Sequence, residues 1–129
     1  MAHPPTQVEE NRDLTAKERE LVQWLLEHGN ANARNFIPQL MQASVRSRCS
    51  CGCASIDFAI AGQRPKHFAM RVLSDFQWKD QNQHLFGAFV FEQDGLLAGL
   101  DLWSVDGKST PSKLPPIEAL VPFGTPQQA

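Results

Sequence analysis

The sequence predicts an α+β fold, with an N-terminal helical pair packed on a curved antiparallel sheet of four or five strands. Three observations support this prediction. Apolar residues recur at helical spacing between residues 14 and 41, whereas from residue 44 onward they alternate as in strands. Asp94-Gly95 then separates two strand-like runs, and this dipeptide favours a two-residue type I′ hairpin.

The first helix is predicted to begin after Thr15. Thr15 and Glu18 have the spacing of a capping box, in which hydroxyl and carboxylate each accept a bond from a free helix amide. Gly29 can adopt the left-handed conformation that ends a helix. The apolar residues that share one face are Leu21, Val22, Leu25 and Leu26.

A second helical pattern follows over residues 33–41 and is interrupted by Pro38. Asn32 is a plausible N-cap for it. Two alternatives remain open: the helix kinks at Pro38, or an irregular turn precedes a short helix with Pro38 in its first turn. Either arrangement pairs this segment with the first helix.

The strands are predicted from alternation and from the polar turns between them. We expect strands over residues 55–60, 68–78, 85–92 and 96–105, with residues 44–53 as a further candidate. In the register set by a two-residue turn, paired residue numbers sum to 189, so that Phe86 faces Trp103.

This register assigns each hairpin residue to one face of the sheet. The face predicted to support the helices carries Leu85, Phe89, Phe91, Leu96, Leu100 and Leu102. The opposite face carries Phe86, Ala88, Val90, Gly99, Asp101 and Trp103.

Both ends of the chain lack periodic apolar faces. We therefore predict a disordered lead-in over residues 1–13, a single domain over 14–123 and a disordered tail over 124–129. Prolines after residue 110 argue against regular structure there, although several apolar residues could pack that segment back partway.

Composition excludes several classes of function. Twelve basic and 14 acidic residues give a net charge of −2, which argues against nucleic-acid binding. No apolar run approaches the roughly 20 residues of a membrane span, and residues 1–13 have no signal-peptide core. We expect no membrane association, a cytoplasmic location and reduced thiols.

Two segments resemble a family of small bacterial proteins of unknown function. The first is Cys51-Gly52-Cys53 with Ser55-Ile56-Asp57, and the second runs from Asp94-Gly95 through Trp103 to Asp106-Gly107. The resemblance extends from about residue 14 to 120. It implies a bacterial origin and one compact domain, and it carries no activity and no catalytic residue.

The cysteines of the chain, Cys49, Cys51 and Cys53, fall within five residues. Thiolates bind zinc, and His28, His67 or His84 would be candidates for a fourth ligand. In an extended strand, however, alternate residues lie about 6.6 Å apart.

That separation splays the sulfurs unless Gly52 bends the chain. We therefore expect three reduced thiols without metal beside a strand edge, acting as small apolar side chains. A metal site and thiol redox chemistry are the alternatives, the latter because Arg46 and Arg48 would favour thiolates.

A second candidate is the mixed aromatic and charged face of the sheet. By parity it would combine Asp57, Arg71, Asp75, Phe86, Asp101 and Trp103. Aromatic residues and arginine are typical of binding surfaces, and paired carboxylates of acid–base chemistry. A plain solvated sheet face, or one covered by the Pro-rich tail, is the alternative.

The leading hypothesis is a non-catalytic binding or protein-interaction domain without a cofactor. Its partner would be another protein or a small ligand, and a homodimer is one form of this. The second hypothesis is a zinc-binding module built on the three cysteines. The third hypothesis is a small enzyme that uses the acidic face. No nucleophile elbow and no phosphate-binding loop occurs in the sequence, so that we name no catalytic residue.

Overall fold

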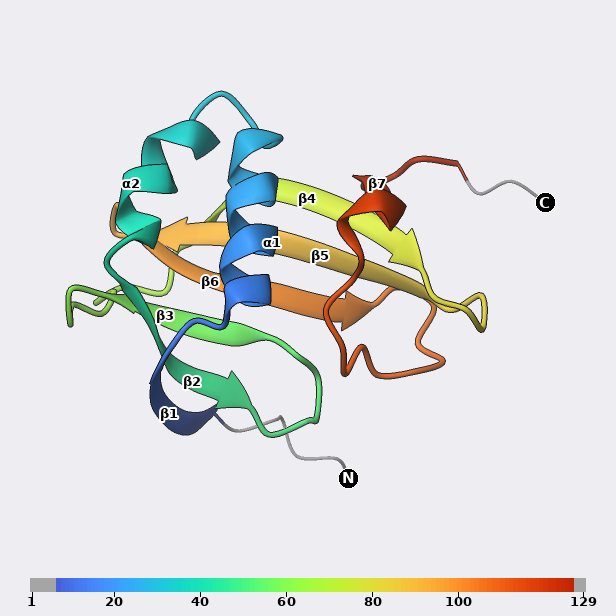
Figure 1. Cartoon of the computed structure of the whole chain (residues 1–129), viewed down its shortest axis with the longest axis horizontal. Coiled ribbons are helices and arrows are strands. Elements are labelled where there is room, and N and C mark those ends of the chain that lie inside the picture. The colour runs from blue at the N-terminus through green and yellow to red at the C-terminus, as the bar shows by residue number, and fades with distance from the viewer. Residues whose placement is uncertain (1–6, 127–129) are drawn as a thin grey trace.

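A seven-stranded sheet carries the helices on one of its faces (Figure 1). A computed structural model describes residues 7–126. The strands are β1 (Gln7–Asp13), β2 (Ala43–Cys49), β3 (Ile56–Ile60), β4 (Arg71–Lys79), β5 (Leu85–Gln93), β6 (Leu96–Ser104) and β7 (Val121–Pro122). The helices are α1 (Ala16–Glu27), α2 (Ile37–Leu40) and the 3₁₀ turns η1 (Ala33–Phe36) and η2 (Ile117–Ala119). Strand order is β1-β2-β3-β6-β5-β4-β7, and each recorded pairing is antiparallel.

Helix α1 confirms the predicted capping box. The Glu18 amide donates to Thr15 Oγ1 and the Thr15 amide donates to Glu18 Oε1. The apolar stripe of the helix is buried against the sheet, and Trp24 makes an edge contact with Phe76 of β4. Because this stripe meets an apolar sheet face, packing rather than propensity stabilises the helix.

The second helical segment is shorter than a full helix. The turn η1 leads into α2, whose first turn contains Pro38, so that the second of the two sequence alternatives is correct. The α+β class is therefore confirmed, but the helical pair consists of one 12-residue helix and two short turns. No helix within residues 7–126 is long and apolar enough to cross a membrane.

The prediction of four or five strands is wrong because both ends of the chain add a strand. Residues 7–13, predicted as part of a disordered lead-in, pair with β2 as β1; residues 1–6 lie outside the described part. β1 lacks an apolar face, so hydropathy gives no sign of it.

At the other end β7 pairs with β4, and Gln77 bonds the backbone of Gly124 and Thr125. These contacts contradict a disordered tail at residues 124–125, while residues 127–129 lie outside the description.

The β5–β6 hairpin follows the predicted register only near its turn. Asp94 and Gly95 both have positive φ, as a type I′ turn requires, and the next two pairs of residues match the prediction. Ala98 then has no partner, and the register shifts by one residue. Trp103 consequently faces Gly87, so the predicted pairing of Phe86 with Trp103 is wrong.

Because of the bulge, the residues of β5 up to Phe91 lie on the side of the sheet opposite to the predicted one, whereas the residues of β6 after Ala98 lie on the predicted side. Buried residues that form the core with α1 include Phe86, Ala88, Val90, Leu100 and Leu102. Phe89 and Phe91 therefore lie on the side of the sheet away from the helices, beside Asp101 and Gly99 in the ladder. Phe86 packs against Trp78 in the core.

An ion pair between Arg12 of β1 and Glu18 of α1 generates a prediction about stability. Arg12 donates to both Glu18 oxygens at 2.8 and 2.9 Å. Burial raises the pKa of Glu18, but bonds from Arg12 and Thr15 outweigh it and leave that pKa below the ordinary value. Glu18→Gln keeps the cap and removes the ion pair, so we expect a loss of about 1–2 kcal/mol at pH 7.

Because the folded-state pKa is lowered, this contribution is present above the ordinary value of 4.5 and is lost as the pH falls through the folded-state value. Urea unfolding of wild type and Glu18→Gln at pH 7 and at acid pH measures the difference. Glu20→Gln, on the exposed side of α1, is the control and should change little. An equal cost of Glu18→Gln at both pH values would contradict the assignment.

Candidate functional site

The loop between β2 and β3 carries the three cysteines, which we call the thiol cluster (Cys49, Cys51 and Cys53). Cys49 is the last residue of β2, and the chain turns before β3 begins at Ile56. Gly52 has a φ of +93°, and a side chain there would meet nothing within 4 Å. This left-handed residue curves the loop in open space.

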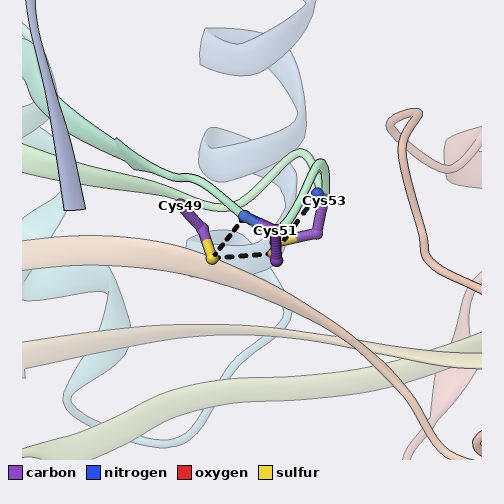
Figure 2. Close-up of side chains that lie close together, drawn as sticks. All are labelled: Cys49, Cys51 and Cys53. Atoms are coloured by element: carbon purple, nitrogen blue, oxygen red, sulfur yellow. Dashed lines mark hydrogen bonds between the residues drawn. The ribbon is translucent and has the colours of Figure 1, made fainter. Parts of the chain in front are cut away.

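The curved loop brings the three sulfur atoms together, as Figure 2 shows. Cys51 Sγ lies 2.7 Å from Cys49 Sγ and 2.8 Å from Cys53 Sγ. All three sulfurs lie within 4.8 Å of one another. The expectation that the C-x-C-x-C spacing splays the sulfurs is therefore wrong, because the segment leaves the extended conformation after β2.

Main-chain amides and one hydroxyl hold the thiol cluster in place. The Cys51 amide donates to Cys49 Sγ at 3.3 Å, and the Cys53 amide donates to Cys51 Sγ at 3.4 Å. Cys53 Sγ donates to Ser55 Oγ at 3.3 Å. Ser55 is buried and bonds both the amide and the carbonyl of Leu102, which anchors the loop to β6. Such outer bonds orient sulfur ligands in metal sites.

Neither the proposed fourth ligands nor the nearby arginines join the cluster. His28 stacks on Trp24, His67 bonds Asp94 and His84 lies beside Asp80. Within residues 7–126, the group that could hold an ion contains the three cysteines alone.

The two arginines bond other groups. Arg48 forms an ion pair with Glu10, and Arg46 donates to the Phe58 carbonyl. The sequence argument that these arginines favour thiolates therefore finds no contact in the structure to support it. The cluster can supply three sulfur ligands on an exposed loop, so that it could bind a metal ion.

A second region lies on the side of the sheet away from the helices. We call it the open face and define it by Asp57, Phe89, Phe91, Asp101 and Trp103. Two glycines shape it: the Trp103 indole lies on Gly87, and the Asp57 carboxylate and Phe91 ring lie on Gly99. An added Cβ would stand 2.3 Å from Trp103 Nε1 or 2.9 Å from Asp57 Oδ1. The indole nitrogen is buried and has no hydrogen-bond partner.

The carboxylates of the open face are partly desolvated. Burial raises the pKa of Asp101, while the Ser55 hydroxyl lowers it and the neighbouring Asp57 raises it further. Burial also raises the pKa of Asp57, against the lowering effects of Arg46 and Ser47. Asp57 pairs with Gly99, and Asp101 is two residues further along β6 on the same face, so the two carboxylates are neighbours across the sheet.

The structure separates the six residues predicted for this face. Asp57, Asp101 and Trp103 lie together on it, and Asp75 lies at its margin opposite Phe89. Phe86 is in the core, and Arg71 is on the helix side, where it pairs with the buried carboxylate of Glu92.

Sequence reasoning missed Phe89, Phe91 and Ser55. The first two were assigned to the core because the bulge at Ala98 was not foreseen. A buried serine two residues after the last cysteine carried no signal that it bonds both that cysteine and β6.

The fold and the thiol cluster define a small antiparallel α+β domain with a cysteine-bearing loop. Residues 11–114 match a domain of unknown function, DUF6984, and the chain belongs to this family. This agrees with the resemblance noted from the sequence at the level of a family of unknown function. No curated protein and no solved structure matches the chain.

The raised pKa of Asp101 generates a prediction. The folded protein disfavours the charged form of the Asp101 carboxyl. The stability that the neutral carboxyl contributes is therefore present below the ordinary pKa of 3.8 and is lost as the pH rises through the folded-state value. Asp101→Asn should therefore raise the free energy of unfolding at pH 7, and the gain should shrink in acid.

Asp106→Asn is the control of opposite sign, because backbone bonds from Leu85 and Lys108 lower the pKa of Asp106. That variant should lose stability at pH 7. Denaturant titrations at several pH values test both variants. A loss in Asp101→Asn that is independent of pH would show that its carboxylate is needed for structure.

Proposed function

We propose that this domain binds a thiophilic metal ion through the thiol cluster. The observation that carries the proposal is the convergence of three sulfur atoms within 4.8 Å on one exposed loop. Thiolate ligands select zinc(II) or copper(I) among the common metal ions. With three protein ligands, zinc would keep a fourth position for water, whereas copper(I) would be held by sulfur alone.

The loop is suited to the small expansion that an ion requires. Zinc–sulfur bonds of about 2.3 Å place tetrahedral ligands about 3.8 Å apart. The two close sulfur pairs stand at 2.7 and 2.8 Å, so each would open by about 1 Å. The open space around Gly52 allows this movement, while Ser55 fixes the end of the loop on β6.

Metal analysis tests the proposal directly. Reduced, metal-free protein is mixed anaerobically with zinc(II) or copper(I), desalted and analysed for bound metal. We expect about one ion per chain, with Cys51→Ser, Cys49→Ser and Cys53→Ser each losing at least tenfold in affinity because each removes a ligand. Binding should weaken in acid because protons compete for the thiolates.

His67→Gln is the matched control, since His67 was a candidate ligand and lies with Asp94 instead. It should keep the metal. Substoichiometric metal in the wild type with both ions, or equal metal in wild type and Cys51→Ser, would refute the proposal.

A second candidate function is recognition of a basic polypeptide segment by the open face. Its supporting observation is the side-by-side placement of two carboxylates and aromatic rings on a sheet face that the helices leave free (Figure 1). Arginine suits such a surface because its guanidinium both pairs with carboxylates and stacks on aromatic rings. The like charges of two open faces disfavour a face-to-face homodimer.

Binding of a labelled arginine–serine repeat peptide tests this second function. We expect binding that weakens with salt and falls at least tenfold in the Asp57→Asn/Asp101→Asn double variant. Glu20→Gln/Glu118→Gln makes the same change in net charge on the exposed surface beside α1 and is the control. If both double variants lost the same amount of peptide affinity, the loss would follow from the change in net charge alone, and this result would contradict a site on the open face.

A further inference from the structure

Cys51 occupies the middle of the thiol cluster, with a second thiol close on either side. Its sulfur lies 2.7 Å from Cys49 Sγ and 2.8 Å from Cys53 Sγ. Cys51 is also the exposed member of the three, whereas Cys49 and Cys53 are half-buried. Thiol–disulfide exchange requires this combination: an accessible sulfur that attacks, and a neighbouring sulfur that resolves the mixed disulfide.

The hydrogen bonds of the loop give its three thiols different roles. The sulfurs of Cys49 and Cys51 each accept a bond from a main-chain amide, and the Cys51 amide binds the same Cys49 sulfur that lies 2.7 Å from Cys51 Sγ. Cys53 instead donates its proton to Ser55 Oγ, which the Leu102 amide and carbonyl hold in place. Cys53 Sγ is thereby held on the anchored Ser55 hydroxyl, whereas Cys49 Sγ is bonded by the amide and the sulfur of Cys51, so that Cys49 is the better partner for Cys51.

We propose that the thiol cluster exchanges with low-molecular-weight disulfides, with Cys51 as the attacking thiol and Cys49 as the resolving one. The Cys51 thiolate attacks one sulfur of a disulfide R–S–S–R. The S–S bond breaks, one R–S⁻ leaves and takes up a proton, and Cys51 is joined to the other R–S group. The Cys49 thiolate then attacks Cys51 Sγ and displaces the second R–S⁻, which is also protonated.

The products are a Cys49–Cys51 disulfide and two molecules of R–SH. Two electrons pass from the cysteines to the external disulfide, so no further oxidant is needed. A disulfide needs an S–S distance of about 2.03–2.05 Å, less than 1 Å shorter than the present contact, and the loop around Gly52 has space to close. The reaction uses the ligands of the proposed metal site but needs no metal.

The test uses the full-length, metal-free, reduced protein in a buffer of oxidised and reduced glutathione. Samples are quenched in acid, alkylated and read by peptide mass spectrometry. We expect the wild type to lose two thiols and to form mainly the Cys49–Cys51 disulfide. Cys53→Ser should behave in the same way, while Cys49→Ser should form the Cys51–Cys53 disulfide.

Cys51→Ser is the decisive variant. It should form an internal disulfide at least about tenfold more slowly than wild type and accumulate singly glutathionylated protein. The reason is that the sulfurs of Cys49 and Cys53 each lie against Cys51 Sγ, which this variant lacks. Circular dichroism checks that each variant is folded. Repeating the reaction in guanidinium chloride should reduce the preference for the Cys49–Cys51 bond, since the preference comes from the folded loop.

Oxidation of Cys51→Ser at the wild-type rate would overturn the proposal, as would wild-type protein that stops at mixed disulfides. These results are distinguishable from failure of the metal proposal. Protein that forms the internal disulfide but retains no metal refutes only metal binding. Protein that retains metal but gives only mixed disulfides refutes only the exchange.

Discussion

The unpaired position of Ala98 in β6 decides which side chains of the central hairpin reach the core. Beyond Ala98 the register of β5 against β6 moves by one residue, so Phe86, Ala88 and Val90 are directed toward α1 together with Leu100 and Leu102. Without the bulge, the apolar sets of the two strands would lie on opposite faces, because successive residues of a strand alternate. The same shift places Phe89 and Phe91 beside Asp101 on the open face, so the core and the candidate binding surface are set by one residue.

A large part of the fold was predictable because local signals and tertiary packing agree. Thr15, Glu18 and the apolar stripe of α1 act within one helix, and Asp94-Gly95 acts within one turn, so their effects could be inferred from neighbouring residues. The bulge at Ala98 has no such local signal: it is favoured because an unbroken register would place the apolar residues of β5 on the face opposite to Leu100 and Leu102 of β6. Strand β1 was missed for a related reason, since its pairing with β2 joins residues that are distant in the sequence.

The candidate site was predictable in its residue types but not in its geometry. Cysteine spacing identified the thiol cluster, yet the outcome depended on whether Gly52 kept the strand extended or turned it. A glycine permits both conformations at little cost, so the sequence alone does not choose between them. Arg71 shows the same difficulty on the open face. It was assigned there by parity, but a register shift between Val72 and Ser74 places its guanidinium against Glu92 on the helix side.

Ser55 connects the two candidate regions through the β6 backbone. Its hydroxyl accepts a bond from Cys53 and from the Leu102 amide, and it also acts on the carboxylate next in sequence to Leu102, that of Asp101. The thiol loop is therefore fixed to the strand that carries the open face, and Cys51 is its exposed thiol. Closing two sulfurs into a disulfide and bringing three sulfurs around an ion require opposite movements of the loop, so one loop conformation cannot serve both. The conformation described, with its closest sulfurs at 2.7 and 2.8 Å, lies between these two states, which is why the same three residues support a metal proposal and an exchange proposal.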